Sequence, residues 1–436
     1  VAEILFLSAG ITRRRSHFGS EILFRAAACT GALYHIDLYL VCGALEGLEP
    51  GVYQFSPQDF SLRRLRAGDY RSVLVRAAGE EPAAAKAPCL IVSASTFWRN
   101  AWKYQSRAYR HCYWDNGTIL ANLLAAAAAR ELPARVVLGF IDAAANELLG
   151  LDPKREAALS IVALGSGASP AALTPTVERI APETVPLSKT EVDYPQMRAM
   201  HEASSLESEE DVLEWRQSAK KAEGERIKDE GKTRNRSFLL QLLSEDEVAK
   251  DSIEDVIVRR GSTREFAREP ITFAQLSTML DRATRGIDAD FLSRYDPALN
   301  EIYVIVHAVE GLPAGAYVFR RPERALELLK EGDFRRDAGY LGLGQEIPAD
   351  CSANIYFLSD LDRVLERFGN RGYRAAQLEA AIRGGKIYLA AYAQRLGASG
   401  LTFFDDDVTE FFSPDGAGKS VMFLVAVGKS AKPRRT

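Results

Sequence analysis

A short segment in the second half of the chain carries residue types that bind phosphate. Residues 259–266 (Arg-Arg-Gly-Ser-Thr-Arg-Glu-Phe) place three guanidiniums, two hydroxyls and a glycine within six positions. Guanidiniums bind phosphate bidentately, and a neighbouring hydroxyl or backbone N–H completes an oxyanion cradle. The segment is therefore a candidate phosphate site, and the competing interpretation is a solvated, charged helix start.

A second candidate segment covers residues 25–34 (Arg-Ala-Ala-Ala-Cys-Thr-Gly-Ala-Leu-Tyr). Small residues before a strand let a flat ligand lie against the backbone and exchange hydrogen bonds with its N–H and C=O groups. A simple strand entry explains the same pattern equally well.

Three other motifs do not hold as sites. Residues 415–420 (Asp-Gly-Ala-Gly-Lys-Ser) resemble a P-loop, but position 413 is Ser instead of Gly, and a strand follows where a helix is required. Residues 165–170 lack the third glycine of a dinucleotide fingerprint. The run Asp405–Asp407 is interpreted as the acidic start of a helix and not as a metal site.

Composition limits the class of protein. The 436 residues are 47% apolar and 26% charged, which is typical of a soluble globular chain. With 55 basic and 59 acidic residues, the chain has no cationic excess with which to bind nucleic acid or an anionic membrane. We therefore expect neither as a partner.

Cysteine and histidine spacing indicates a reduced protein without a structural metal. The five cysteines (29, 42, 89, 112, 351) form no C-x-x-C pair, and the five histidines have no partner at ligand spacing. No signal peptide or bilayer span is visible, so the expected compartment is the cytoplasm.

An internal repeat organises the chain. Residues 45–55 match residues 309–319 with six identities in eleven positions, at an offset of 264. The same offset pairs residues 107–110 (Arg-Ala-Tyr-Arg) with residues 371–374 (Arg-Gly-Tyr-Arg), and Asp142 with Asp406. One register over about a hundred residues indicates a tandem duplication.

Each copy has the same expected elements, which together predict α+β sheet domains. The expected strands are 37–41, 52–55, 89–93, 135–140 and 158–164 in the first copy, and 301–306, 316–319, 354–358, 401–404 and 421–427 in the second. The expected long helices are 116–130 and 377–395. We place the first domain at residues 1–165, the second at 253–436, and between them a linker, 166–252, whose charged part (207–230) is interpreted as a solvated helix or linker.

The combined motifs resemble the nitroreductase superfamily, specifically its SagB/ThcOx-type dehydrogenase branch. The resemblance rests on residues 25–34, on 46–53 (Glu-Gly-Leu-Glu-Pro-Gly-Val-Tyr) and on Trp102-Lys-Tyr with residues 107–110. It also rests on Asp115-x-Gly-x-x-x-x-Asn-Leu123 and on residues 146–152 (Asn-Glu-Leu-Leu-Gly-Leu-Asp). It covers nearly all of the first copy and, more faintly, the second.

The resemblance implies an FMN flavoenzyme. Family members are dimers with each flavin at the subunit interface, so a tandem chain of two nitroreductase-like domains is expected to form an intramolecular pseudo-dimer, with further oligomerisation open. NAD(P)H is the candidate electron donor. The substrate would be a small molecule, such as a nitro compound or quinone, or a peptide.

The implied site residues come from both copies. Site one would take its phosphate cradle from Arg260, Ser262 and Arg264 and its strand from Gly400, Leu401 and Thr402. The wall of the flavin ring would come from Arg25, Cys29, Thr30, Gly31 and Ala32. Site two would need a cradle before Val1 and a wall at residues 295–298, where the pattern is lost, so we expect one working site. Lys432–Arg435 could add a phosphate contact, although a frayed tail explains it equally well.

Two departures from the family pattern lie near the expected flavin. Cys29 stands where the family has Ser, and His35 stands where it often has Pro. Because Cys is a small residue much like Ser and His35 suits a polar strand entry, neither is assigned a catalytic role.

Three functions follow from these observations. The leading one is an FMN-dependent oxidoreductase with a single flavin. The second is a peptide-modifying dehydrogenase that oxidises azoline rings, for which no substrate-recognition module is evident. The third is a pseudoenzyme scaffold that binds flavin weakly or not at all, which the set Arg260, Ser262 and Arg264 opposes.

Overall fold

The computed structural model describes residues 1–17, 20–169, 175–221, 236–293 and 298–431. Their contacts divide the chain into two compact units. The first unit comprises residues 1–224, 287–297 and 365–375, and the second comprises 225–286, 298–364 and 376–436. Two short segments of the second copy therefore belong to the first unit.

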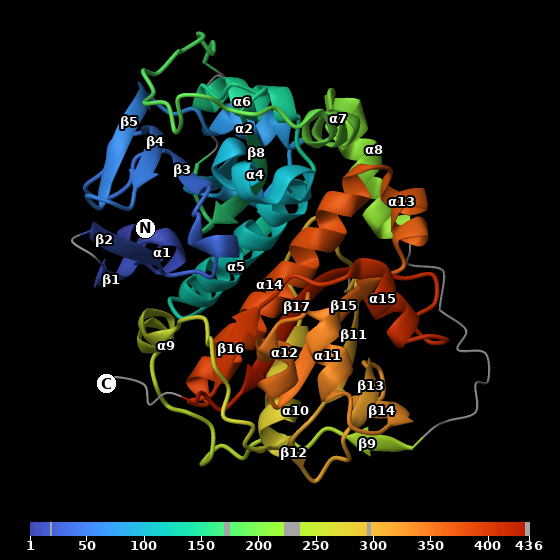
Figure 1. Ribbon diagram of the computed structural model, residues 1–436. Helices are drawn as coiled ribbons and strands as arrows, with labels where there is room; N and C mark the ends of the chain where they lie inside the picture. The colour runs from blue at the N-terminus through green and yellow to red at the C-terminus, as the bar shows by residue number, and fades with distance from the viewer. Residues whose placement is uncertain (18–19, 170–174, 222–235, 294–297, 432–436) are drawn as a thin grey trace. The chain divides into compact units, whose positions relative to one another are not determined.

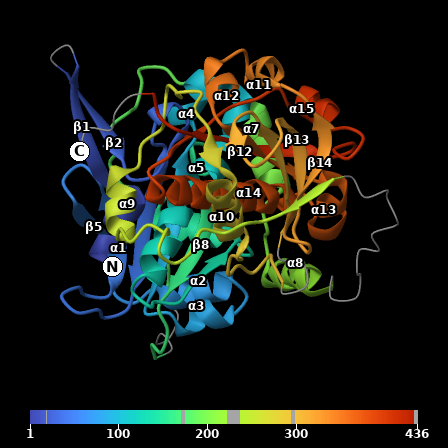
Figure 2. The same cartoon turned by 90° about the horizontal axis from the view of Figure 1, so that it is seen from below.

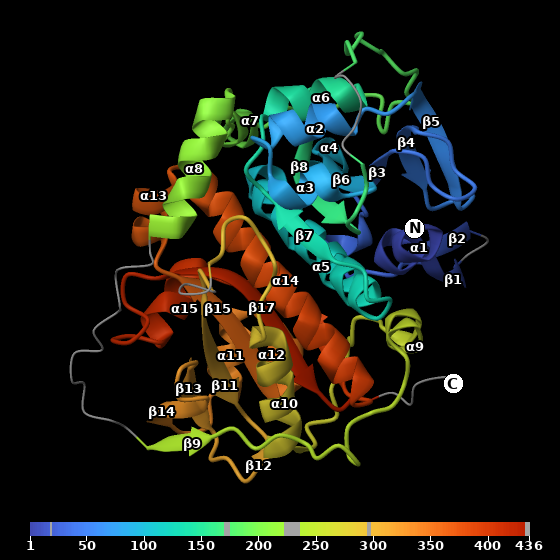
Figure 3. The ribbon, with the colours of Figure 1, turned by 180° about the vertical axis from the view of Figure 1, so that it is seen from behind.

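The first unit is built on an antiparallel sheet whose described strands run in the order β5-β4-β3-β6-β8-β7 (Figure 1; all six strands are labelled in Figure 3). These strands are β3 (Ile36–Cys42), β4 (Gly51–Ser56), β5 (Ser61–Ala67), β6 (Cys89–Thr96), β7 (Ala134–Val137) and β8 (Glu156–Leu164). The inward-facing residues of β3, β6 and β8 pack with α2 (Arg71–Ala77), α3 (Pro82–Lys86) and α6 (Asp142–Leu149) into a core of Val, Leu and Ala side chains.

Three further helices of this unit contribute residues to the candidate site described below. They are α1 (Ala2–Ala9), α4 (Trp98–Tyr104) and the long α5 (Ala108–Ala128), with short 3-10 turns at Thr30–Ala32 and Gln105–Arg107. A two-stranded hairpin of β1 (Ile11–His17) and β2 (Ser20–Arg25) precedes the first turn (Figure 2).

The second unit repeats this sheet, with the described order β16-β17-β15-β11-β13-β14-β9 (Figure 3). Its strands are β9 (Ser237–Leu239), β11 (Glu301–Val306), β13 (Gly315–Arg320), β14 (Ala325–Glu331), β15 (Ala353–Ser359), β16 (Gly397–Gly400) and β17 (Ser420–Gly428), with a separate parallel pair of β10 (Ile271–Thr272) and β12 (Val309–Glu310). Its helices are α9 (Ile253–Arg259), α10 (Phe273–Thr284), α11 (Arg335–Leu341), α12 (Glu346–Asp350), α15 (Asp405–Phe411), the first half of α13 (Leu361–Phe368) and the main part of α14 (Arg371–Ala393).

The elements of the two copies coincide at the offset seen in the sequence. Strands β4, β5 and β8 and helices α2 and α3 have the same bounds as β13, β14, β17, α11 and α12 when 264 is added to their residue numbers. The shared sheet order and bounds confirm that the chain holds two α+β domains of one kind in tandem.

Several expected elements are confirmed, and one strand is wrong. Both long helices are present and begin earlier than expected, at Ala108 and Arg371. The run Asp405–Asp407 does start helix α15, and β17 does follow the P-loop-like segment. The strand expected at 401–404 lies instead at Gly397–Gly400, because this small-residue segment pairs with β17.

The region between the copies contributes two helices, α7 (Pro195–Ala203) and α8 (Glu209–Lys221). Helix α8 carries the charges noted in the sequence, yet Val212, Trp215 and Ala219 on it are buried. The Trp215 indole N–H donates a hydrogen bond to the carbonyl of Phe368 (3.1 Å), so this face of the helix is packed and not solvated. None of the described helices is both long and apolar enough to cross a membrane.

Candidate functional site

The turn at residues 29–34 in the first unit has an unusual backbone. Gly31, Ala32 and Tyr34 all have positive φ, at 63°, 54° and 48°. Non-glycine residues adopt this region at a cost, and such backbones persist where the surroundings fix them. A glycine adopts a positive φ without this cost, and Gly31 is the exposed residue of the turn.

Asp115 of helix α5 fixes this turn. Its Oδ1 accepts hydrogen bonds from the backbone N–H and the hydroxyl of Thr30, both at 2.8 Å. Its Oδ2 accepts from the Cys29 thiol at 3.0 Å, and the Tyr34 N–H donates to that sulfur at 3.0 Å. One buried carboxylate thus holds two adjacent residues of the predicted flavin wall, Cys29 and Thr30.

His35 is the second partner of the same carboxylate oxygen. Its Nε2 lies 2.8 Å from Asp115 Oδ2, and its Nδ1 lies 2.8 Å from the Ser95 hydroxyl. Burial lowers the pKa of His35, but the hydrogen bonds and charges of Asp115 and Cys112 together outweigh it and raise the pKa to about 9. Burial raises the pKa of Asp115, but the hydrogen bond and charge of His35 and the hydrogen bond from Cys29 together outweigh it, so the net pKa is lowered. The pair is therefore an imidazolium and a carboxylate at neutral pH.

The Cys29 thiol stays protonated in this environment. Burial raises its pKa well above the ordinary value, and the negative charge of Asp115 raises it further. A protonated, hydrogen-bonded thiol is a poor nucleophile.

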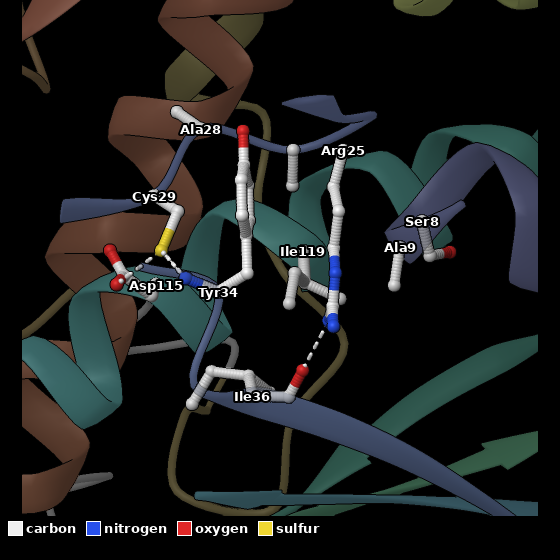
Figure 4. A pocket seen from close by; sticks show the side chains of 10 residues that line it. Ser8, Ala9, Arg25, Ala28, Cys29, Tyr34, Ile36, Asp115 and Ile119 are labelled. Carbon is white, nitrogen blue, oxygen red and sulfur yellow. Dashed lines mark hydrogen bonds between the residues drawn. The ribbon is translucent and has the colours of Figure 1, made fainter. Parts of the chain in front are cut away.

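A small pocket opens beside this network (Figure 4). It holds about 220 Å³ of empty space, part of it open to solvent, and its wall includes Arg25, Cys29, Tyr34, Asp115 and Ile119. The Arg25 guanidinium donates to the carbonyl of Ile36 at 2.7 Å. Burial is the main reason why its pKa is lowered.

Two side chains that the sequence analysis did not assign to the site lie against this turn. A Cβ atom added at Gly31 would stand 2.7 Å from the Tyr104 hydroxyl and 3.4 Å from Lys103 Nζ. Both residues belong to the Trp102-Lys-Tyr motif of the sequence. Their proximity to Gly31 depends on how α4 packs, which the spacing of the motif does not predict.

The predicted phosphate cradle lies in the second unit, directly after helix α9. The Thr263 N–H donates to the carbonyl of Ala398 at 2.9 Å, which docks the segment on strand β16. Gly397 allows this approach, because a Cβ there would stand 2.3 Å from the Thr263 hydroxyl oxygen. The segment is therefore part of the sheet edge, not a solvated helix start.

Tyr388 of helix α14 joins the cradle to the strand. Its hydroxyl lies 3.5 Å from the Ser262 hydroxyl and accepts a hydrogen bond from the Gly400 N–H. The Arg260 guanidinium lies 5.9 Å from its ring centroid. The structure thus brings Arg260, Ser262 and Gly400 together, as predicted, with Arg264 exposed on the same segment.

The remaining predicted residues of this half follow the strand. Leu401 is buried and its N–H donates to the carbonyl of Leu424 at 3.2 Å, while Thr402 lies beyond the end of β16. Lys432–Arg435 and residues 295–297 of the second expected wall lie outside the described residues.

The second copy has a different structure where the first has its pocket. The counterparts of Asp115 and Ile119 at the offset of 264 are Glu379 and Arg383, both fully buried. The Arg383 guanidinium forms an ion pair with Glu379, whose carboxylate also accepts from the Asn300 amide. At these two positions the second copy therefore has a buried ion pair, where the first copy has a carboxylate and an isoleucine that line a pocket.

Comparison with known proteins identifies the family of the chain. The sequence model of the nitroreductase family matches residues 18–166 and 257–429. A nitroreductase-like protein of Methanocaldococcus jannaschii is 26% identical over 170 residues, which cover 38% of this chain and 85% of that protein. A crystal structure of a nitroreductase-like protein from Anabaena variabilis is 28% identical and superimposes with a TM-score of 0.80 over 98% of this chain and 87% of that chain. Because the two matched segments span well over half of the sequence, the chain belongs to the nitroreductase family.

Proposed function

We propose that the chain is an FMN-dependent oxidoreductase that holds one flavin. The observation that carries this proposal is the cluster of Arg260, Ser262 and Gly400 around Tyr388. Its guanidinium, hydroxyl and backbone groups form the donor set that a phosphate monoester requires. Arg264 is exposed on the same five-residue segment and can serve as the second guanidinium. The residues present therefore fit the FMN phosphate.

We assign the flavin ring to the turn of the first unit, following the family resemblance. Arg25, Cys29, Thr30, Gly31 and Ala32 would hold it, and Asp115 would keep the turn in shape through the Thr30 N–H and hydroxyl. When bound, FMN would supply the hydride chemistry, with NAD(P)H as the donor and a nitro compound or quinone as the acceptor. The chain's own residues would position the substrate over the exposed Gly31.

The proposal of a single flavin rests on the second copy. There the position of Ile119 is occupied by Arg383, and its guanidinium is neutralised by Glu379 inside the unit. Opening this place for a ligand would leave a buried charge without its partner, which is strongly unfavourable. We therefore expect one flavin for each chain and not two.

Flavin content tests the proposal directly. The visible spectrum of the purified chain and the flavin released on denaturation should give about one FMN per chain. The double variant Arg260→Ala/Arg264→Ala should lose at least nine-tenths of its flavin. Arg268→Ala is the matched control, because this exposed guanidinium pairs with Asp350 outside the cradle.

Each outcome has a defined meaning. Unchanged flavin in the double variant, with circular dichroism equal to that of the parent, would refute the cradle assignment. Two FMN per chain would refute the single-site proposal. A chain that takes up no flavin from excess FMN would refute the oxidoreductase proposal and favour a scaffold without flavin.

A further inference from the structure

Three potential metal ligands converge in the first unit. The Cys29 sulfur, the His35 ring nitrogen and an Asp115 carboxylate oxygen all lie within 4.8 Å of one another. Cys29 and His35 come from one short segment and Asp115 from helix α5, so the cluster joins two elements. Thiolate, imidazole and carboxylate are together the ligand types of a zinc site.

The two departures from the family pattern meet at the same atom. The resemblance led us to expect Ser at position 29 and Pro at position 35, neither of which offers a good ligand for a soft metal. Both replacements point at Asp115 Oδ2, with Cys29 Sγ at 3.0 Å and His35 Nε2 at 2.8 Å. The second copy has Ser293, Leu299 and Glu379 at the corresponding positions, so the ligand set belongs to the first copy alone.

Two of the ligands, His35 and Asp115, have outer contacts that orient them. His35 Nδ1 lies 2.8 Å from the Ser95 hydroxyl, which fixes the ring and leaves Nε2 directed at the cluster. Asp115 Oδ1 is held by the N–H and hydroxyl of Thr30, so that only Oδ2 faces the cluster. Such outer-shell hydrogen bonds accompany metal ligands in proteins because they set ring orientation and ligand basicity.

A fourth position is open on one side. Cys29 and Asp115 line the pocket described above, so a water molecule or a small anion can reach the cluster from there (Figure 4). Three protein ligands with an open fourth position is the arrangement of zinc sites that exchange their fourth ligand. Arg25 in the same wall favours an anionic fourth ligand.

We propose that Cys29, His35 and Asp115 form a zinc site whose fourth ligand comes from the adjacent pocket. The present ligand separations are those of hydrogen bonds. With zinc bonds of about 2.0–2.3 Å, Asp115 Oδ2 would move away from Cys29 Sγ and His35 Nε2 by roughly half an ångström to complete a tetrahedron. The ion would tie the turn at residues 29–34 to helix α5 in place of two shared protons.

The test uses the full chain, stripped with a chelator and free of flavin. Zn²⁺ is titrated in competition with a colorimetric chelator, and Co²⁺ serves as a spectroscopic probe because a thiolate ligand adds a charge-transfer band. We expect one Zn²⁺ per chain, and a cobalt band that disappears in Cys29→Ser. Affinity should fall at least tenfold in both Cys29→Ser and His35→Asn.

The matched control is Cys351→Ser. That thiol is buried in the second unit and donates to the carbonyl of Pro348, a bond that a serine can keep, so zinc affinity should not change. No stoichiometric binding, or binding that Cys29→Ser and His35→Asn leave intact, would overturn the proposal. The zinc site shares Cys29 with the turn assigned to the flavin ring, so flavin content is counted separately after incubation with FMN, and loss of zinc binding is distinguished from loss of flavin.

Discussion

Asp142 forms two ion pairs inside the first unit. Its two carboxylate oxygens each accept a hydrogen bond of 2.6 Å, one from Arg371 and one from Arg374. Both guanidiniums are fully buried, and Arg371 also donates to the carbonyl of Leu138 at 2.7 Å. Two cations and one anion thus share a site from which water is excluded.

The pKa of Asp142 gives a lower bound for this contact. Burial raises it, but the charges of Arg371 and Arg374 outweigh burial and hold the pKa at about 2. The shift from the ordinary value corresponds to about 2 kcal/mol in favour of the carboxylate. Removing one member of a buried ion pair costs about 3–5 kcal/mol, because the remaining charge loses its partner. For Asp142→Asn we therefore expect a loss of about 3 kcal/mol.

Urea unfolding followed by tryptophan fluorescence measures the loss of stability of the first unit. All four tryptophans (98, 102, 114 and 215) lie in the first unit. Asp193→Asn is the control, because its ion pair with Arg198 is exposed and its removal should leave the midpoint almost unchanged.

A double-mutant cycle separates the ion pair from other effects of the substitution. Asp142→Asn with Arg374→Gln should cost less than the two single changes added together, by at least 1 kcal/mol. An additive result, or an Asp142→Asn variant within about 1 kcal/mol of the parent, would show that the guanidiniums are held by the surrounding carbonyls alone.

Three further predictions concern single contacts. Burial, then the charge of Arg374, lowers the pKa of His201 to about 3, so acidification protonates this residue only in the unfolded chain. The free energy of unfolding that is lost between pH 7 and 5.5 should therefore be about 1 kcal/mol smaller in His201→Gln than in the parent. An equal loss in both proteins would contradict this. Arg383→Ala should lower the calorimetric stability of the second unit by about 3 kcal/mol, and adding Glu379→Gln should restore part of it, because the buried carboxylate loses its cation. Gly31→Ala should cost about 1 kcal/mol by tryptophan-monitored unfolding, because φ is 63° there; a neutral result would mean that the turn relaxes.

The repeated framework was accessible from the sequence because it depends on local patterns. Alternating apolar residues mark β3 and β11, and a long run of helix-forming residues marks α5 and α14, so each copy could be laid out element by element. The exact offset then constrained both copies at once. The cradle at Arg260 and Ser262 was found because its residue types are adjacent in the chain.

Contacts between distant segments could not be found in this way. The pairing of Arg371 with Asp142 spans 229 residues, and neither residue type predicts its partner. The shift of the strand from 401–404 to β16 has a related cause. Phe403 and Phe404 have high strand propensity, but the register of β17 selects the small residues 397–400, which fit beside the cradle.

The two copies share a framework and differ in the residues that surround one buried carboxylate. The sheet order and the bounds of the corresponding strands agree closely between the copies. The residues that differ lie on the long helices, Asp115 and Ile119 on α5 and Glu379 and Arg383 on α14. Asp115 in the first copy faces a thiol, an imidazole and an open pocket, whereas Glu379 in the second is neutralised by Arg383. Both carboxylates face a cation, the His35 imidazolium in the first copy and Arg383 from the next helical turn in the second. The copies differ one turn further along the helix, where Ile119 lines a pocket and Arg383 pairs with Glu379.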